Sequence, residues 1–304
     1  MKLILKQFIY LLLLSAVINT VHATLRVETT TQDLAAIASV IGGSHIEVHS
    51  LTIGTRDPHF AVAKPSMIRR VYRADLLLVI GADMEIGWLP PLLQSARNSR
   101  VQPGSPGYLD LSETVKLLGK QQGPVTRDMG DVHARGNPHY WLDPRNGVHM
   151  AKMISEQLSQ LDPEHATDYY ANFKAFEKNV NTKFQQWRSE LKHLNGKTVI
   201  AYHTSFVYLA EAFGFSIVDE VEPKPGISPS AASLNALITR IKKEQIGLLI
   251  MAPYYERRSA RYLNEETDIQ IAVLPQSVGA EPDIQTYPDL FDAIVKALKT
   301  TGEN

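Results

Sequence analysis

A long amphipathic stretch in the middle of the chain is the strongest constraint on the fold. Its large apolar residues recur every three or four positions: Tyr169, Phe173, Phe176, Val180, Phe184, Trp187, Leu191 and Leu194. This spacing places them on one face of a single α-helix, on the order of 40 Å long at about 1.5 Å per residue. We predict a rigid linking helix over residues 162–196, ended by Asn195 and Gly196, that joins two lobes.

Strand-like and helix-like segments alternate on both sides of this helix. Strands are predicted over residues 25–29, 45–51, 75–80, 108–111, 197–202, 215–221, 247–251 and 269–274. Helices are predicted over residues 31–41, 65–73, 85–96, 145–161, 205–213, 230–244, 256–266 and 287–298. Such alternation is typical of an α/β fold with mainly parallel sheets and flanking helices. We therefore predict two βα lobes, N-terminal over residues 24–161 and C-terminal over residues 197–304.

The first 23 residues have the pattern of a secretory signal peptide. Two lysines precede an apolar run from Phe8 to Ile18, which is too short to span a membrane, and small residues lead to a cleavage site after Ala23. The sequence contains no cysteine, which excludes disulfides, thiolate ligands and a lipid-bearing cysteine at that site. We expect a periplasmic, monomeric protein without a lipid anchor.

The charge of the chain excludes several classes of partner. Its 31 basic and 32 acidic residues almost cancel. A nucleic-acid or anionic-lipid partner is typically matched by a strong basic excess, which is absent here. The function must therefore be sought in a local site.

Three of the ten histidines stand in settings that suggest a binding site. His203 directly follows the predicted strand over 197–202, and ligands of α/β sheets gather at the carboxyl ends of strands. His59 lies in the loop after another predicted strand, beside Pro58. His139 lies in the rigid sequence Gly-Asn-Pro-His-Tyr-Trp-Leu-Asp-Pro. We predict that these three imidazoles meet in the cleft between the lobes.

Three imidazoles without a thiolate suit a borderline metal ion such as Zn(II), with bonds of about 2.0–2.1 Å. A harder ion such as Mn(II) favours more carboxylate oxygen. Carboxylates such as Asp143 are candidate acceptors for an imidazole N–H, which would fix the tautomer of the ring. The blander interpretation of each histidine is a hydrogen-bonded structural residue, and it is the one we give to the histidines on predicted helices and on the strand 45–51.

Four ordered motifs resemble a known family. They are Asp57-Pro58-His59, Asn137-Pro138-His139-Tyr140-Trp141-Leu142-Asp143-Pro144, Tyr202-His203 and Glu222-Pro223-Lys224-Pro225-Gly226-Ile227-Ser228-Pro229-Ser230. In these motifs the chain resembles the solute-binding proteins of bacterial zinc and manganese ABC importers, the ZnuA/TroA-like family. The resemblance implies two lobes joined by one long helix, a metal ion between them and a membrane permease as partner. It also implies that His59, His139 and His203 are metal ligands, in a set closer to the zinc-binding members than to the manganese-binding ones.

The chain departs from that family at two places. Ser277 stands where members often supply an aspartate as fourth ligand, which leaves water, Glu281, Asp283 and Ser277 as alternatives, with water or a carboxylate preferred over the serine. Many zinc-binding members also carry a histidine-rich loop before the second ligand. The corresponding loop here, over residues 119–136, contains only His133, so we expect it to gather metal weakly.

Other functions fit parts of the pattern. A manganese-binding protein of the same transport class is one alternative. A zinc hydrolase is another, because three histidines and an acidified water also form catalytic zinc sites. No general base stands beside a candidate ligand in the sequence, and we predict a transport protein that is not an enzyme.

Overall fold

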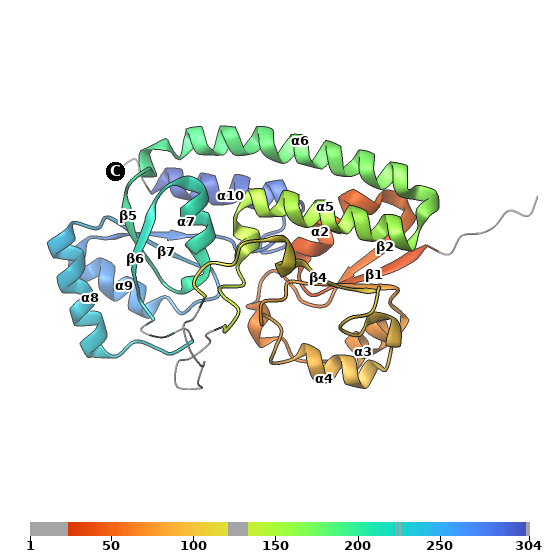
Figure 1. Ribbon diagram of the computed structural model, residues 1–304. Helices are drawn as coiled ribbons and strands as arrows, with labels where there is room; N and C mark the ends of the chain where they lie inside the picture. The colour runs from red at the N-terminus through yellow and green to blue at the C-terminus, as the bar shows by residue number, and fades with distance from the viewer. Residues whose placement is uncertain (1–23, 121–132, 223, 225, 302–304) are drawn as a thin grey trace, which may run out of the picture.

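The computed structural model describes residues 24–120, 133–222, 224 and 226–301 of the chain (Figure 1). The predicted signal peptide over residues 1–23 lies outside the described residues, as do residues 121–132 of the predicted loop. The described chain forms two four-stranded parallel sheets with flanking helices, which confirms the predicted α/β class. None of the helices in the described part combines the length and the apolar character that a membrane crossing requires.

The sheet of the N-terminal lobe has the strand order β2-β1-β3-β4. Its elements are β1 (Leu25–Thr29), α2 (Gln32–Gly42), β2 (Ile46–Ser50), α3 (Pro65–Arg73), β3 (Leu76–Val79), α4 (Leu89–Ala96), β4 (Tyr108–Asp110) and α5 (Pro144–Leu161). Alternate residues of β3 point to opposite faces. Leu76 and Leu78 pack in a core with α2 and α5, whereas Leu77 and Val79 pack in a second core with α3 and α4. Helices therefore cover both faces of the sheet, as the continuous apolar run predicts.

The C-terminal lobe repeats this arrangement with the strand order β6-β5-β7-β8. Its elements are β5 (Thr198–Ala201), α7 (Val207–Phe213), β6 (Ser216–Glu220), α8 (Ala231–Glu244), β7 (Leu248–Met251), α9 (Arg258–Thr267), β8 (Gln270–Val273) and α10 (Tyr287–Thr300). Short 3-10 helices connect the elements of both lobes: η1 (Gly43–His45), η2 (Pro58–Phe60), η3 (Ser99–Val101), η4 (Leu111–Thr114), η6 (Tyr140–Leu142), η7 (Pro163–His165), η8 (Lys192–Leu194) and η9 (Thr204–Phe206). The candidate ligands lie at three of these: His59 is within η2, and His139 and His203 directly precede η6 and η9.

The predicted linking helix is α6 (Ala166–Glu190), which runs across both lobes (Figure 1). Its end differs from the prediction. The α-helix stops at Glu190, and η8 follows it before the chain reaches Asn195 and Gly196. The Gly196 N–H donates to the carbonyl oxygen of Gly214, at 2.7 Å, so this glycine belongs to the connection into β5 rather than to a helix cap.

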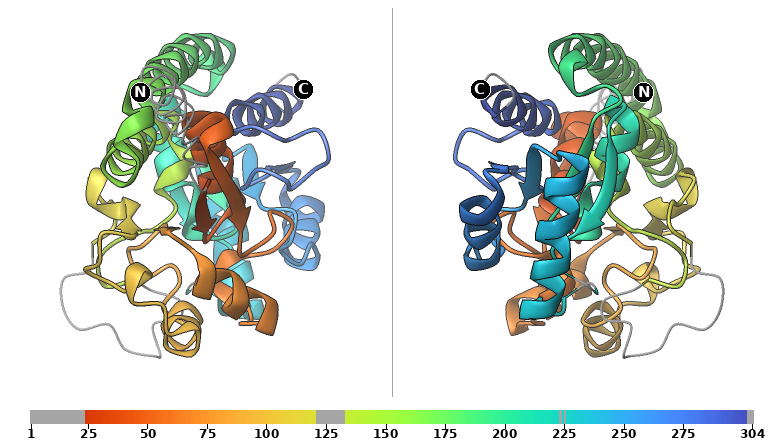
Figure 2. Two further views of the ribbon diagram at one scale, coloured as in Figure 1. Left: turned by 90° about the vertical axis from the view of Figure 1, so that its right-hand side faces the viewer. Right: turned by 90° about the vertical axis from the view of Figure 1, so that its left-hand side faces the viewer.

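One hydrophobic core runs through both lobes along α6. It includes Val27 of the N-terminal sheet, Phe176 and Trp187 of α6, and Phe291 of α10. Figures 1 and 2 show α5, α6 and α10 on the same side of the molecule, where α6 bridges the two sheets. Opening the lobes widely would expose this shared apolar surface, at about 25 cal/mol per Å². The fold therefore resists a wide hinge motion.

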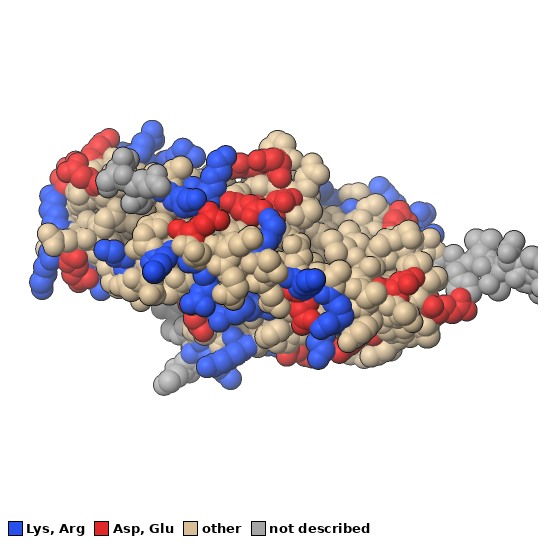
Figure 3. Space-filling model, turned by 90° about the horizontal axis from the view of Figure 1, so that it is seen from above, with Lys and Arg blue, Asp and Glu red and all other residues tan. Residues whose placement is uncertain are grey.

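The outer face over α6 carries basic and acidic side chains in mixture (Figure 3). This distribution agrees with the balance of 31 basic and 32 acidic residues in the sequence. The long helix is thus amphipathic in the ordinary sense, with one apolar face in the shared core and one charged face in water.

Asp33 joins the two lobes from the first turn of α2, where it is fully buried. Its Oδ2 accepts a hydrogen bond of 2.5 Å from Ser277 Oγ, and its Oδ1 accepts one of 2.9 Å from the Val278 N–H. Both partners follow β8 of the C-terminal lobe. Burial raises the pKa of Asp33 to about 7, although the hydrogen bonds act in the opposite direction.

We expect the substitution Asp33→Asn to flatten the pH dependence of the free energy of unfolding. In the wild type the folded-state pKa of about 7 exceeds the ordinary value of 3.8, so the folded protein binds this proton more tightly than the unfolded chain. The resulting stabilisation is complete below about pH 4 and is lost as the pH rises through 7, with a slope of up to about 1.4 kcal/mol per pH unit. Asparagine does not titrate and keeps an acceptor for Val278. Urea unfolding of the metal-free protein at several pH values measures the slope.

The exposed Asp283 supplies the control for this experiment. Asp283→Asn should keep the slope of the wild type. Glu85, whose pKa burial also raises to about 7, remains in both variants, so the slope of Asp33→Asn falls without reaching zero. Equal slopes in Asp33→Asn and the wild type would contradict the assignment.

Candidate metal centre

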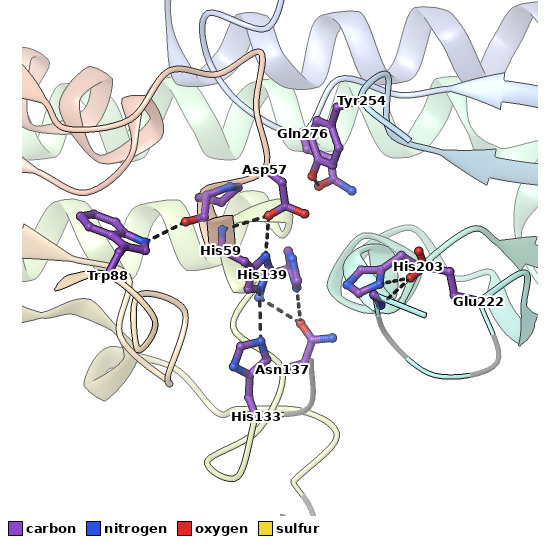
Figure 4. A network of polar contacts seen from close by, with 12 residues as sticks. Asp57, His59, Trp88, His133, Asn137, His139, His203, Glu222, Tyr254 and Gln276 are labelled. Atoms are coloured by element: carbon purple, nitrogen blue, oxygen red, sulfur yellow. Dashed lines mark hydrogen bonds and ion pairs between the residues drawn. The ribbon is translucent and has the colours of Figure 1, made fainter. Parts of the chain in front are cut away.

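The structure brings the three predicted histidines together at the seam between the lobes (Figure 4). The ring centroids of His59 and His139 lie 5.0 Å apart, those of His139 and His203 lie 5.8 Å apart, and those of His59 and His203 lie 6.4 Å apart. All three side chains are buried. Imidazoles bound to one tetrahedral zinc ion, with bonds of about 2.0–2.1 Å, have centroids roughly 5 Å apart. The three rings are therefore spaced almost as ligands of one ion.

Two of the histidines are held by the same local motif, in which Asp or Asn, then Pro, precedes the histidine. Asp57 Oδ1 accepts hydrogen bonds from the backbone N–H of His59, at 2.9 Å, and from its Nδ1, at 2.6 Å. Asn137 Oδ1 does the same for His139, at 2.9 and 3.0 Å. The side chain two residues upstream thus fixes both the backbone and the ring of each histidine.

Neighbouring tryptophans support these two loops. Trp88 Nε1 donates to the carbonyl oxygen of Pro58, at 3.0 Å, next to His59. Trp141 Nε1 donates across the seam to the carbonyl oxygen of Gln276, at 2.8 Å, and its ring lies 5.3 Å from that of His139. Because both tryptophans are buried, the two loops are tied to the cores of the lobes.

His203 is held differently. It directly follows Tyr202, whose N–H continues the sheet by donating to the carbonyl oxygen of Ile250, at 2.8 Å. The Nδ1 of His203 lies 2.8 Å from Glu222 Oε2, which also accepts a hydrogen bond of 2.9 Å from the Gly226 N–H. Glu222 thus connects the histidine to the proline-rich segment after β6.

In all three histidines Nδ1 contacts an oxygen atom, which leaves Nε2 as the nitrogen for an ion. Partners of this kind fix the tautomer and raise the basicity of a metal-binding imidazole. The prediction that Asp143 serves in this way is wrong. Its carboxylate caps α5 and pairs with Arg145, two residues downstream, at 2.7 Å.

The electrostatic surroundings favour a neutral His139 and an ionised Asp57. Burial, together with the charges of His59, His203 and His133, holds the pKa of His139 well below its usual range. Burial by itself would raise the pKa of Asp57, but the hydrogen bond and the charge of His59 outweigh it and lower that pKa. A neutral imidazole is the form that binds a metal ion, so these surroundings suit His139 as a ligand.

The candidates for a fourth ligand lie in different settings. Glu281 and Asp283 are exposed at the surface. Ser277 Oγ donates its hydrogen bond to Asp33. His133, the single histidine of the loop that is expected to gather metal weakly, lies inside the site, with its Nε2 atom 3.1 Å from Nε2 of His59. No periodicity or motif around His133 marks it, so the sequence offers no signal beyond the residue type.

The side chains form a hydrogen-bonded arrangement rather than a finished cage. Within the described ranges, no set of three or more His, Cys, Asp or Glu side chains is arranged to hold an ion as it stands. The contact between His59 and His133 occupies the Nε2 atom through which His59 would bind. Small rotations of the rings must therefore accompany ion binding.

Comparison with known proteins identifies the family. The family model described as ZnuA, zinc-uptake complex component A, periplasmic, matches residues 27–301. The chain belongs to this family. ZnuA-family proteins are metal-binding components of ABC importers and are not enzymes, so the chain is an extracytoplasmic solute-binding protein for a divalent metal ion. The hydrolase alternative is thereby excluded.

Individual relatives of this ZnuA-family chain differ in the ion that they are named for. The chain is 29% identical over 160 residues to the high-affinity zinc uptake system protein ZnuA of Brucella abortus. This alignment covers 53% of this chain and 47% of that protein. The chain is also 24% identical over 255 residues to the manganese ABC transporter substrate-binding lipoprotein PsaA of Streptococcus pneumoniae. This alignment covers 81% of this chain and 78% of that protein. A crystal structure of ZnuA has the same fold, with a TM-score of 0.77 at 21% identity over 92% of this chain and 100% of that one.

Proposed function

We propose that this protein captures zinc in the periplasm through His59, His139 and His203 and delivers it to the membrane permease of an ABC importer. The observation that carries the proposal is the convergence of three buried imidazoles, each with Nδ1 held by an oxygen atom. The predicted signal peptide over residues 1–23 supports a periplasmic location.

The set of donor atoms supports zinc over manganese. Three imidazole nitrogens suit a borderline ion, whereas Mn(II) prefers carboxylate and carbonyl oxygens. The two carboxylates beside the rings, Asp57 and Glu222, contact the Nδ1 atoms and so stand behind the imidazoles. Some relatives are named for zinc and others for manganese, so their names do not distinguish the two ions. The preference for zinc therefore depends on the donor atoms.

Release of the ion follows from the same structure. Since one core runs through both lobes along α6, wide opening is costly, and release proceeds by local movement of the ligand loops. The loop that carries His203 and the loop that carries His59 belong to different lobes. Contact with the permease on either loop would separate the ligands without unfolding the core.

The test is to measure which metal the protein carries and prefers. Protein purified without chelators or nickel resin should contain zinc at one ion per chain, and competition titration should show much tighter binding of Zn(II) than of Mn(II). Bacterial cells that lack the protein should take up zinc more slowly at low external zinc and recover when it is restored. Equal or tighter binding of Mn(II) would overturn the assignment of zinc.

A further inference from the structure

His133 stands closer to the candidate metal centre than its place in the sequence suggests. We propose that His133 is a fourth metal ligand, which completes a site of four imidazoles and favours zinc over manganese. This inference rests on the proposed role of His59, His139 and His203. It assigns a ligand to the position for which the sequence offers only water, two carboxylates and a serine.

The distance between His133 and His59 is that of two ligands of one ion. Their Nε2 atoms are 3.1 Å apart, and their ring centroids are 5.1 Å apart. Two nitrogens bound to one tetrahedral zinc ion at about 2.0–2.1 Å are about 3.3–3.4 Å apart. Without an ion, two ring nitrogens this close must share one proton, whereas an ion would take both lone pairs. The two nitrogens need to separate by only a few tenths of an ångström, while small rotations of the rings turn both lone pairs toward the ion.

The turn that carries His133 is anchored to the N-terminal lobe. The Gly136 N–H donates to the carbonyl oxygen of His133, at 3.2 Å, and closes the turn. Arg135 Nη1 pairs with Oδ2 of Asp110, the last residue of β4, at 3.0 Å. The N–H of Asn137 then donates to the carbonyl oxygen of Leu118, at 2.8 Å. These contacts hold His133 beside the site, and its side chain is 9% exposed.

The oxygen donors around the site have other partners. Asp57 and Glu222 contact the Nδ1 atoms of His59 and His203, and Ser277 Oγ donates to Asp33. Glu281 and Asp283 are exposed. Among the candidates, His133 is the one whose donor nitrogen already lies against a predicted ligand nitrogen. Figure 4 shows its ring directed at His59 from the side opposite Asp57.

A fourth imidazole has a chemical consequence for selectivity. Zinc accepts four nitrogen ligands in a tetrahedron, while Mn(II) loses the oxygen ligands that it prefers. In the His133→Ala variant a water molecule takes the fourth position, and the site becomes more acceptable to manganese. His133 should therefore affect the ratio of the two affinities more than the binding of manganese itself.

The experiment compares His133→Ala with the wild type in the full mature protein. Zinc K-edge X-ray absorption of the zinc-loaded protein should count four imidazoles in the wild type and three in the variant. Competition titrations should show a loss of zinc affinity of at least about tenfold. The affinity for Mn(II) should change less, so that the preference for zinc narrows by a similar factor.

His193→Ala is the matched control, because His193 is exposed in η8, away from the site. It should leave the imidazole count and both affinities unchanged. Three imidazoles in the wild type, or an unchanged zinc-to-manganese ratio in His133→Ala, would overturn the role of His133 and leave the proposed function standing. A wild-type protein that fails to bind zinc at all would instead overturn the proposed function.

Discussion

Replacing His139 with alanine should lower the affinity of the protein for zinc by roughly two to three orders of magnitude. Structural zinc sites bind with about 10–16 kcal/mol, so one of four ligands accounts for about 2.5–4 kcal/mol, and each 1.4 kcal/mol is a factor of ten. His139 forms a compact triangle with the other two rings, at 5.0 Å from His59 and 5.8 Å from His203, so its loss removes one corner of the site. His59→Ala and His203→Ala should have similar effects. Competition with a zinc-binding dye of known affinity measures all three.

The matched control for this series is His149→Ala. His149 lies on the exposed side of α5, outside the candidate site. Its replacement should leave zinc affinity unchanged, and circular dichroism should show native helix content in all four variants. Near-normal affinity in any one of the three site variants would remove that histidine from the ligand set.

The fold could be predicted because its signals are local. The spacing of Phe173, Phe176 and Val180 marks one helical face, and the run over 76–80 is apolar throughout because helices cover both sides of β3. The boundaries of the helices are harder to predict from the sequence. The predicted helix over 85–96 begins only at Leu89, because the preceding turn places Ala82 and Asp83 at positive φ. The carboxylate of Glu85 instead accepts hydrogen bonds from the N–H groups of Ile80 and Gly81, and the helix starts after it.

The candidate site could be predicted in part for the same reason. His203 follows a strand, and the side chain two residues before His59 or His139 forms an Asx turn that can be read from the sequence. The contact of His133 with His59 spans 74 residues and depends on a turn that is docked by Arg135. No local pattern encodes such a contact. The prediction for Asp143 is wrong because a carboxylate near a histidine in the sequence can equally cap the following helix, and the contact with Arg145 holds it in the second role.

The same limit applies to the connection between the lobes. The length of α6, which the sequence predicts, favours a rigid linking helix. The structure adds contacts across the boundary between the lobes, which would also oppose their separation. Tyr287 Oη donates to the carbonyl oxygen of Trp141, at 2.5 Å, and a Cβ atom at Gly147 would lie 2.1 Å from the Tyr287 ring. These contacts join η6 and α5 to α10 over more than a hundred residues, which is why no periodicity reveals them.

Trp141 connects this seam to the metal centre, so its loss should affect both stability and binding. Trp141→Ala should reduce the free energy of unfolding of the metal-free protein by about 3–5 kcal/mol, because the ring is 1% exposed in the shared core. Zinc affinity should fall as well, since the ring packs 5.3 Å from that of His139. Urea unfolding and zinc competition measure the two effects.

Two further variants separate packing from hydrogen bonding at Trp141. Trp141→Phe keeps most of the apolar contact but removes the donor to the carbonyl oxygen of Gln276, and should cost about 1–3 kcal/mol. Tyr170→Ala, which truncates an aromatic ring that is 61% exposed on α6, should change stability by no more than about 0.5 kcal/mol. If Trp141→Ala were no more costly than Tyr170→Ala, the seam would not hold the lobes together. The ion would then be free to leave by a wide hinge motion, contrary to release through the ligand loops.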